Sequence, residues 1–227
     1  MNIIEKKFAT IEDAASALAV DLKNNLNEAI SARGHSLLAV SGGNTPKKVF
    51  EYLRKQKLDW NNVIITLTDE RWVPNDHIES NEQLVRSYLL KYLPEGTSFV
   101  PLYGGQETLE VDVKLFESRL KNLPLPFDAV YLGMGVDGHF ASLFPGDKTF
   151  DIYDSHCIAV PGTNTRLARI SLTVSTILNA RKIYLLFSGK DKLSMYLKAR
   201  TPGLYDEIPL RIVLSQNKIP VMVYYTE

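Results

Sequence analysis

The sequence has little cysteine and no long apolar run. Cys157 is the single cysteine among 227 residues, which excludes an intrachain disulfide and favours a reducing compartment. No stretch approaches the ~20 apolar residues of a membrane span. The first residues, Met1 to Lys7, also lack the apolar core of a signal peptide. We therefore expect a soluble, cytoplasmic protein with no membrane partner.

An excess of charge of one sign is also missing. Lys and Arg together number 26, and so do Asp and Glu, which makes the formal net charge zero. Proteins that bind nucleic acid through its phosphates usually carry a cationic excess, so we expect no nucleic-acid partner. A small anionic ligand stays compatible with this balance, because such a ligand needs only a few local cations.

Internal repeats, low-complexity tracts and Ser/Gly-rich linkers are absent as well. The length suits one large domain or two small ones. Gly and Pro fall mostly between apolar runs, where they mark turns. We expect a single domain over residues 1–227.

What the sequence does contain is an alternation of short apolar runs and segments of helical periodicity. The expected strands are 36–40, 63–67, 127–132, 168–173, 182–187 and 221–225, and the expected helices begin near Thr10, Thr45, Ser80, Glu107 and Lys190. This order predicts an α/β fold of three layers, α/β/α, with a parallel-dominated sheet. Because ligands bind at the carboxyl ends of such strands, the segments that follow the strands are candidates for a site.

The segment after strand 36–40 is rich in glycine and small polar residues. Its residues are Ser41, Gly42, Gly43, Asn44 and Thr45, and a helix begins at once. Glycines let the backbone approach a ligand closely, and a helix N-terminus offers free N–H groups and a positive dipole end. The segment is either an anion cradle or a plain capped turn.

Three consecutive charged residues follow strand 63–67. They are Asp69, Glu70 and Arg71, in the run TDERWVP. Charges of this kind are seldom buried without partners. The run is either a solvated ion-pair loop or a carboxylate and a guanidinium directed into a common cleft.

A glycine-rich segment, GMGVDGHFASLFPG, follows strand 127–132. In it Asp137 and His139 flank Gly138. A carboxylate beside an imidazole can orient the ring and raise its basicity. Since imidazole titrates near ~6.5, it is a usable base at neutral pH. The pattern favours a catalytic role for His139 over a structural one.

Cations also follow later strands. Arg166, Arg169 and Lys192 are ordinary surface charges when taken singly, but together with the Ser41–Thr45 segment they could close on a phosphate. The remaining histidines, His35, His77 and His156, lack metal-ligand spacing, and Cys157 opens an apolar stretch as a small buried side chain would. We expect neither a metal nor a cofactor.

Three motifs together carry a resemblance to a known family. They are SGGNTPKKVFEYL, TDERWVP followed by Ser80-Asn81, and LGMGVDGHFASLFPG, in this order. They resemble the 6-phosphogluconolactonase family over most of the chain, to about Pro209. The third motif is the most specific, and the first is shared by a wider sugar-phosphate superfamily.

The resemblance implies a modified Rossmann-like fold related to ribose-phosphate isomerases and CoA transferases. It implies hydrolysis of 6-phosphogluconolactone to 6-phosphogluconate, the second step of the oxidative pentose phosphate pathway. The ending Val223-Tyr224-Tyr225-Thr226 departs from the Trp-Phe-Leu-Asp-like ending of the family. We expect a phosphosugar lactone as substrate and a monomer or weak homo-oligomer.

Matched residue by residue, the resemblance also implies roles. His139 would be the general base, with Asp137 beside it, and Arg71 and Asp69 would line the lactone side of the site. Substrate and phosphate contacts would come from Ser41, Gly42, Gly43, Asn44, Thr45, Gly138, Arg169 and Lys192. Arg166 is a weaker candidate, because the spacing around it does not match the family.

Two other functions stay open. Glucosamine-6-phosphate deaminases share the SGG loop, the Asp-Glu pair and Asp-Gly-His. They usually have a Glu where Phe144 stands and a Tyr where Arg71 stands, and both differences favour the lactonase. A sugar-phosphate sensor would need a DNA-binding module, for which the chain has no spare segment.

Overall fold

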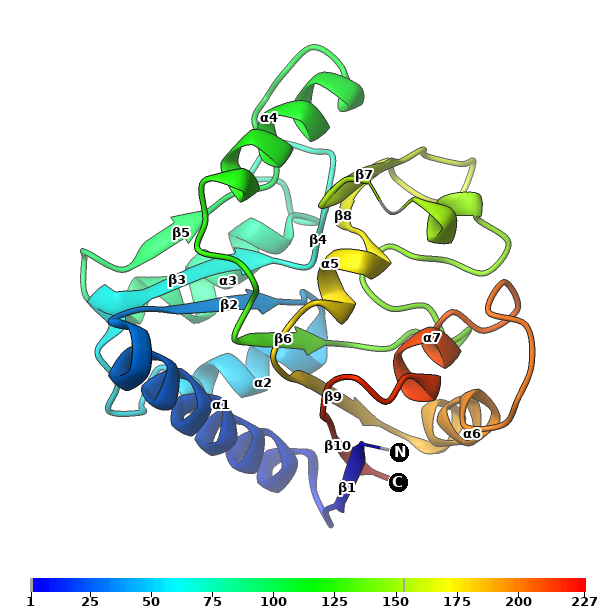
Figure 1. Cartoon of the computed structure of the whole chain (residues 1–227), viewed down its shortest axis with the longest axis horizontal. Coiled ribbons are helices and arrows are strands. Elements are labelled where there is room, and N and C mark those ends of the chain that lie inside the picture. Colours follow the sequence, from blue (N-terminus) through cyan, green and yellow to red (C-terminus); the bar gives the residue numbers. More distant parts are fainter. Residues whose placement is uncertain (1, 153) are drawn as a thin grey trace.

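Parallel strands form the centre of the molecule (Figure 1). The computed structural model describes residues 2–152 and 154–227, and within them a seven-stranded sheet has the order β1-β10-β9-β6-β2-β3-β5. Its strands are β1 (Ile3–Lys7), β2 (Ser36–Val40), β3 (Val63–Leu67), β5 (Ser98–Val100), β6 (Ala129–Leu132), β9 (Ile183–Ser188) and β10 (Val221–Thr226). Every neighbouring pair in this sheet is parallel.

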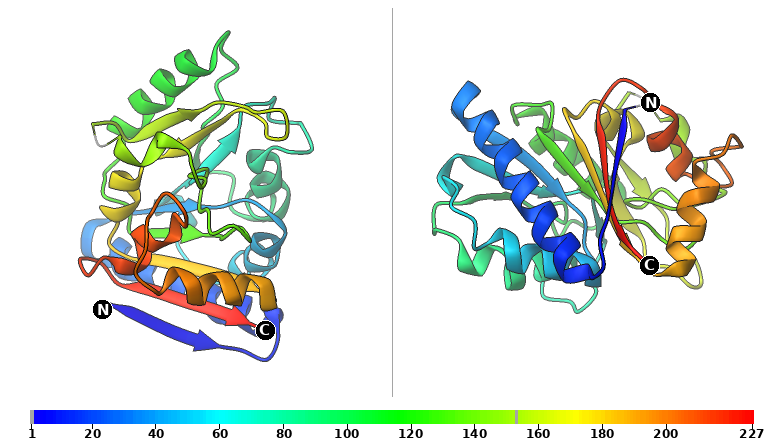
Figure 2. Two further views of the ribbon diagram at one scale, coloured as in Figure 1. Left: turned by 90° about the vertical axis from the view of Figure 1, so that its right-hand side faces the viewer. Right: turned by 90° about the horizontal axis from the view of Figure 1, so that it is seen from below.

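Helices cover both faces of this sheet. They are α1 (Ile11–Arg33), α2 (Asn44–Leu53), α3 (Asn81–Tyr88), α4 (Leu109–Lys121), α5 (Val174–Leu178), α6 (Lys190–Ala199) and α7 (Leu210–Ser215). In Figure 2, right, α1 lies on one side of the strands and α6 and α7 lie on the other. The predicted α/β/α layering with a parallel sheet is confirmed.

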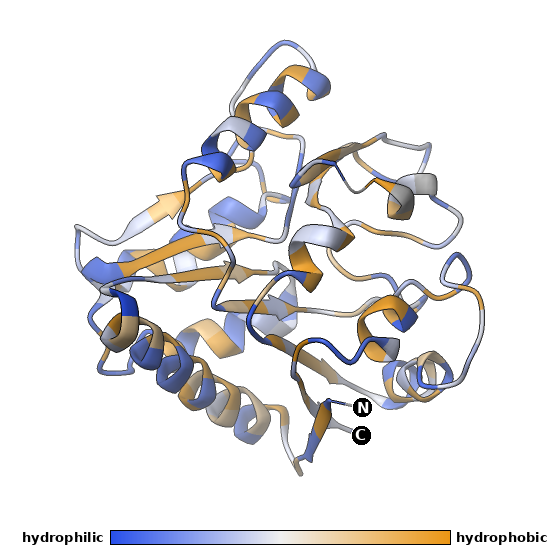
Figure 3. Cartoon of the chain, viewed as in Figure 1, coloured by the Kyte–Doolittle hydropathy of each residue, from blue (hydrophilic) through white to orange (hydrophobic). Residues whose placement is uncertain are grey.

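Local sequence accounts for the first helix. The Thr10 side chain accepts a hydrogen bond from the Asp13 N–H, and Gly34 ends the helix in the left-handed region at φ 79°. One face of α1 is buried through Ala14, Ala15, Leu18, Ala19, Leu22, Leu26 and Ala29. Figure 3 shows the result, with apolar colour along the central strands and mixed colour along α1.

A second, smaller sheet lies beside α4 and was not expected. It contains β4 (Asp69–Arg71), β8 (Arg169–Leu172) and β7 (Cys157–Val160), and both of its pairings are antiparallel. The strand predicted at 168–173 therefore exists, but it pairs outside the main sheet. Antiparallel strands can be joined by a short loop, so β7 and β8 need no crossover helix between them.

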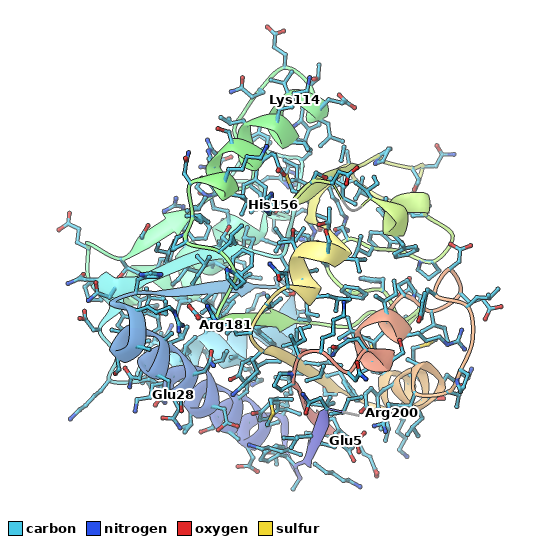
Figure 4. All side chains as sticks on the ribbon, in the orientation of Figure 1. Glu5, Glu28, Lys114, His156, Arg181 and Arg200 are labelled. Atoms are coloured by element: carbon cyan, nitrogen blue, oxygen red, sulfur yellow. The ribbon has the colours of Figure 1, made fainter. Side chains whose placement is uncertain are left out.

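The two ends of the described chain lie side by side, because β1 pairs with β10 at the edge of the sheet (Figure 1). Glu5 of β1 accepts hydrogen bonds from Tyr196 of α6 and from Arg200, the residue that follows α6, and Glu5 and Arg200 are labelled near this edge in Figure 4. These contacts connect β1 to the C-terminal end of α6. Across residues 2–152 and 154–227, none of the helices combines the length and the apolar character that crossing a bilayer requires.

Candidate active site

The carboxyl ends of β2, β3, β6 and β9 meet at one edge of the main sheet. Val40 pairs with both Leu67 and Tyr131, so β2, β3 and β6 end close to the same level, and β9 continues three residues beyond Leu185, the partner of Leu132. The segments that follow them surround a cavity of about 250 Å³. Among the predicted site residues, its walls contain Ser41, Gly42, Gly43, Asn44, Thr45, Asp69, Arg71, His139, Arg169 and Lys192.

The Ser41–Thr45 segment forms one wall. Gly43 precedes α2 with φ 110°, a left-handed conformation that favours glycine, and no side chain caps the helix there. The first N–H groups of this ten-residue helix therefore remain for a ligand. A phosphate at this position would also meet the positive end of the helix dipole.

Within the described residues, the side chain of Ser41, unlike those of its neighbours, is hydrogen-bonded to the surrounding strands. Its hydroxyl donates to the Tyr131 carbonyl (3.1 Å), lies 2.9 Å from Thr68 Oγ1, and accepts the Gly133 N–H (3.2 Å). These bonds join the ends of three strands. The Ser41 side chain thus holds the edge of the site together.

Asp69 is held by other side chains. It is 5% exposed, accepts a hydrogen bond from Ser142 Oγ at 2.6 Å, and lies 3.5 Å from Arg169 Nη1. Burial lowers the pKa of Arg169, an effect that the charge of Asp69 opposes and that of Arg71 reinforces. A carboxylate in this position fixes and partly neutralises the neighbouring guanidinium.

Three cations line the cavity. Arg71 of β4 and Arg169 of β8 are direct partners across the antiparallel ladder. Like charges in such positions are destabilising unless an anion lies between them. Lys192, from the first turn of α6, adds a third cation, and burial lowers the pKa of its ammonium. The cavity is therefore suited to an anionic ligand.

Glu70 points away from this cavity and into the protein. It is 1% exposed and accepts hydrogen bonds from the N–H groups of Arg71, Asn81 and Glu82, each at 2.7 Å, and from Ser80 Oγ at 3.0 Å. Burial raises the pKa of Glu70 to about 7, while these hydrogen bonds favour its ionised form. Of the two alternatives left open for this run, the solvated ion-pair loop does not apply to Glu70, because α3 supplies the partners that allow burial.

Asp137 and His139 form a bonded pair at the rim of the cavity. Asp137 Oδ1 lies 2.6 Å from His139 Nδ1 and also accepts the His139 backbone N–H at 3.1 Å. Burial alone would raise the pKa of Asp137, but the hydrogen bond and charge of His139 outweigh it, and the pKa falls below its ordinary value. With Nδ1 engaged, Nε2 is the ring nitrogen that can accept a proton.

Gly138 makes this local turn possible. Its φ is 82°, and a Cβ there would lie 2.6 Å from Ile208 Cγ2. Neither Gly138 nor Asp137 is part of the cavity wall as far as the described residues define it. Both residues instead shape the loop that carries His139.

Phe144 backs the imidazole on another side. Its ring centroid lies 4.5 Å from that of His139, and the Arg166 guanidinium lies 4.0 Å from the Phe144 centroid. Arg166 also forms an ion pair with Asp147 at 2.8 Å. Arg166, the weaker of the predicted cations, thus packs behind Phe144 and outside the cavity wall.

Asn81 lines the cavity and was missed as a site residue. Its Oδ1 accepts a hydrogen bond from Arg71 Nη1 (3.1 Å), and its Nδ2 donates to the Asp69 carbonyl (2.8 Å). The only sequence signal was its place beside the helix cap Ser80, in the second motif. The other lining residues that were not predicted are Pro46, Gly133, Met134, Gly135, Ala141 and Leu186.

His156 and Cys157 lie outside the site and have structural partners. His156 Nδ1 lies 2.8 Å from Glu117 Oε1, and Cys157 is 1% exposed, as predicted for a small buried side chain. Burial raises the pKa of the Cys157 thiol. In the described residues, no group of three or more His, Cys, Asp or Glu side chains is arranged to hold a metal ion.

Known proteins resemble this chain over almost its whole length. A protein named 6-phosphogluconolactonase from Rhizobium meliloti is 37% identical over 230 residues, which covers 99% of this chain and 97% of that protein. A crystal structure of a 6-phosphogluconolactonase from Shewanella baltica is 40% identical, with a TM-score of 0.95, and covers 99% and 98% of the two chains.

A more distant structure shares the fold alone. It is a monomeric glucosamine-6-phosphate deaminase, 18% identical, with a TM-score of 0.83 over 100% of this chain and 98% of that one. The family described as glucosamine-6-phosphate isomerases/6-phosphogluconolactonase matches residues 9–222. The chain therefore belongs to the glucosamine-6-phosphate isomerase/6-phosphogluconolactonase family, among its 6-phosphogluconolactonases.

Proposed function

We propose that this chain hydrolyses 6-phospho-D-glucono-1,5-lactone to 6-phospho-D-gluconate, the second step of the oxidative pentose phosphate pathway, with His139 as general base. The observation that carries the proposal is the Asp137–His139 pair at a cavity with an uncapped helix N-terminus and three cations. The kinship with 6-phosphogluconolactonases supports the same reaction.

The chemistry requires one proton acceptor. His139 Nε2 takes a proton from water as the water oxygen attacks the lactone carbonyl carbon. The tetrahedral intermediate then breaks its bond to the ring oxygen, which receives the proton from the imidazolium. Asp137 keeps Nδ1 protonated and stabilises the imidazolium. A positioned base of this kind contributes about 10²–10⁴-fold in rate.

The charged residues divide between the two ends of the substrate. We assign Arg71 to the carbonyl oxygen, where a cationic donor stabilises the developing oxyanion. Asp69 acts through Arg169, which it holds in place. The phosphate contacts fall to Gly42, Gly43, Asn44, Thr45, Arg169 and Lys192, with Ser41 and Gly138 supporting the surrounding backbone. The contacts with the phosphate orient the lactone, and the reaction takes place at the carbonyl end of the substrate.

The deaminase alternative is disfavoured by one contact. In that reaction a carboxylate assists ring opening where Phe144 stands in this chain. Here the apolar Phe144 ring packs directly against the His139 imidazole. A sensor without turnover is disfavoured by the intact Asp137–His139 pair.

A lactonase assay tests the proposal. The lactone is generated in situ, and its decay is followed with and without the protein. We expect decay far above the spontaneous rate, and decay at the spontaneous rate would reject the assignment. Ammonia release from glucosamine 6-phosphate, measured in parallel, would favour the deaminase.

Three further expectations accompany this proposal. Residues 1–227 form a single domain, the enzyme is cytoplasmic, and it is a monomer or a weak homo-oligomer without nucleic-acid or membrane partners. Limited proteolysis, cell fractionation and sedimentation at several protein concentrations test these expectations in turn.

A further inference from the structure

Asn81 joins two walls of the cavity that lie far apart in the sequence. Its side chain is bonded to β4 twice, through Arg71 Nη1 and the Asp69 carbonyl. On its other side it packs against the phosphate loop, where a Cβ on Gly42 would lie only 1.8 Å from Asn81 Oδ1. At 2% exposure, the amide has little room for another orientation.

The amide orientation is set by its surroundings. The Asp69 carbonyl can only accept, so it selects Nδ2 and turns Oδ1 toward Arg71. The Asn81 backbone is fixed too, because its N–H donates to the buried Glu70 carboxylate at 2.7 Å. Glu70 also accepts the Arg71 N–H at 2.7 Å. One carboxylate thus holds the backbone of both residues whose side chains meet.

The bonds of Arg71 leave one part of its guanidinium for a ligand. Nη1 donates to Asn81 Oδ1 and to the Glu79 carbonyl. Arg71 Nε is enclosed by the protein, whereas Nη2 is not buried and has no bonded acceptor among the residues that the structure describes. Because Arg71 lines the cavity, Nη2 is the nitrogen that a substrate oxygen can reach, and such an oxygen would give it an acceptor.

We propose that Asn81 is a positioning residue for Arg71, which it holds by Nη1 so that Nη2 faces the carbonyl end of the lactone. This inference rests on the proposed function and assigns a role to a residue of the same site. The planar fork of arginine makes such an anchor effective, because fixing one nitrogen fixes the directions of the others. Misplacement by about 1 Å can cost about 10²-fold in rate.

A double-mutant cycle tests the inference, with kcat and KM measured in the lactonase assay. We expect Asn81→Ala to lower kcat by about 10- to 100-fold and to change KM by less than about threefold, because the phosphate grip is intact. Arg71→Ala should lower kcat by about 10²–10³-fold. The double variant should be no slower than Arg71→Ala, since Asn81 has no guanidinium left to position.

The controls separate this inference from the proposed function. An inactive wild-type protein would reject the function itself. An active wild type in which the kcat losses of Asn81→Ala and Arg71→Ala multiply in the double variant would reject the positioning role alone.

Two further variants serve as controls. Asn62→Ala, at an exposed site, should keep full activity. If Asn81→Ala does not fold, Asn81→Asp keeps the volume beside Gly42. Its effect on kcat should vanish in the Arg71→Ala background, and persistence of that effect would overturn the inference.

Discussion

Asp137 Oδ1 lies 2.6 Å from His139 Nδ1, and the same oxygen accepts the backbone N–H of His139 at 3.1 Å. One carboxylate oxygen therefore orients both the ring and the backbone of the residue that we assign as the base. Only one residue separates the two, and Gly138 between them adopts the left-handed φ of 82°. The pair is a local structure of the loop and needs no distant element to align it.

Replacing this carboxylate by an amide tests its effect on the imidazole. In Asp137→Asn the amide can donate to Nδ1, which favours the tautomer with the proton on Nε2. We expect kcat to fall by about 10²-fold with little change in KM. Steady-state kinetics measure both constants. Asp59→Asn, at an exposed position, is the matched control, and turnover of Asp137→Asn equal to this control would contradict the role of Asp137.

A second prediction concerns the buried Glu70. In Glu70→Gln one oxygen becomes an NH₂ group that faces backbone N–H donors, so at least one buried donor loses its acceptor. We expect the free energy of unfolding to fall by about 1–3 kcal/mol. Urea denaturation measures this change. Glu95→Gln, at an exposed position, should leave stability unchanged, and a Glu70 variant as stable as Glu95→Gln would argue against the Glu70 network.

A third prediction concerns the contact between the phosphate loop and α3. Gly42→Ala places a methyl group against Asn81 Oδ1, at 1.8 Å before any adjustment. We expect a loss of about 1–3 kcal/mol in stability, typical of overpacking, together with lower kcat/KM. In the double variant Gly42→Ala/Asn81→Ala, thermal unfolding should show that stability is regained. The lactonase assay should show that its kcat/KM stays low. Failure of Asn81→Ala to restore any stability would show that the strain lies elsewhere.

A fourth prediction concerns pH and the contact between α4 and β7. Burial alone would raise the pKa of Glu117, but hydrogen bonds from the His156 side chain and backbone outweigh it and lower the pKa. Lys121 Nζ lies 3.7 Å from Glu117 Oε1. His156 is labelled beside this region in Figure 4.

The direction of the pH dependence follows from the linkage between proton binding and folding stability. The stability that Glu117 contributes is fully present above its unfolded pKa, near 4.5, and is lost as the pH falls through the lower folded value. Glu117→Gln should therefore be less stable than the wild type at pH 7, and the difference should shrink below pH 4.5. Urea unfolding at pH 7 and under acid conditions measures it. A difference that stays constant with pH would contradict this assignment.

The sequence predicted five of the seven strands of the main sheet, because those five are strongly apolar, and it missed the edge strands β1 and β5. Runs such as SLLAV and VIITL, with helix caps at Thr10 and Ser80, mark elements that local chemistry determines. The small antiparallel sheet was missed, since β4 reads as three charged residues. Only the tertiary partners of Glu70 and Arg71 explain why such a segment is a strand.

The same reasoning applies to the site. Glycine-rich and charged segments after strands were informative, because parallel strands bring their carboxyl ends together. Asn81 comes from the start of a helix, and its position in the cavity depends on how α3 packs against β4. Side chains that reach a site from a neighbouring element in this way leave no periodic pattern in the sequence.

The kcat of His139→Ala with 6-phosphogluconolactone, made in situ and corrected for spontaneous hydrolysis, tests the central claim most directly. His35→Ala, at the opposite end of β2, is the matched control and should retain wild-type turnover. We predict that His139→Ala lowers kcat by about 10²–10⁴-fold and leaves KM within about threefold. Turnover of His139→Ala close to that of His35→Ala would contradict the assignment of His139 as the base.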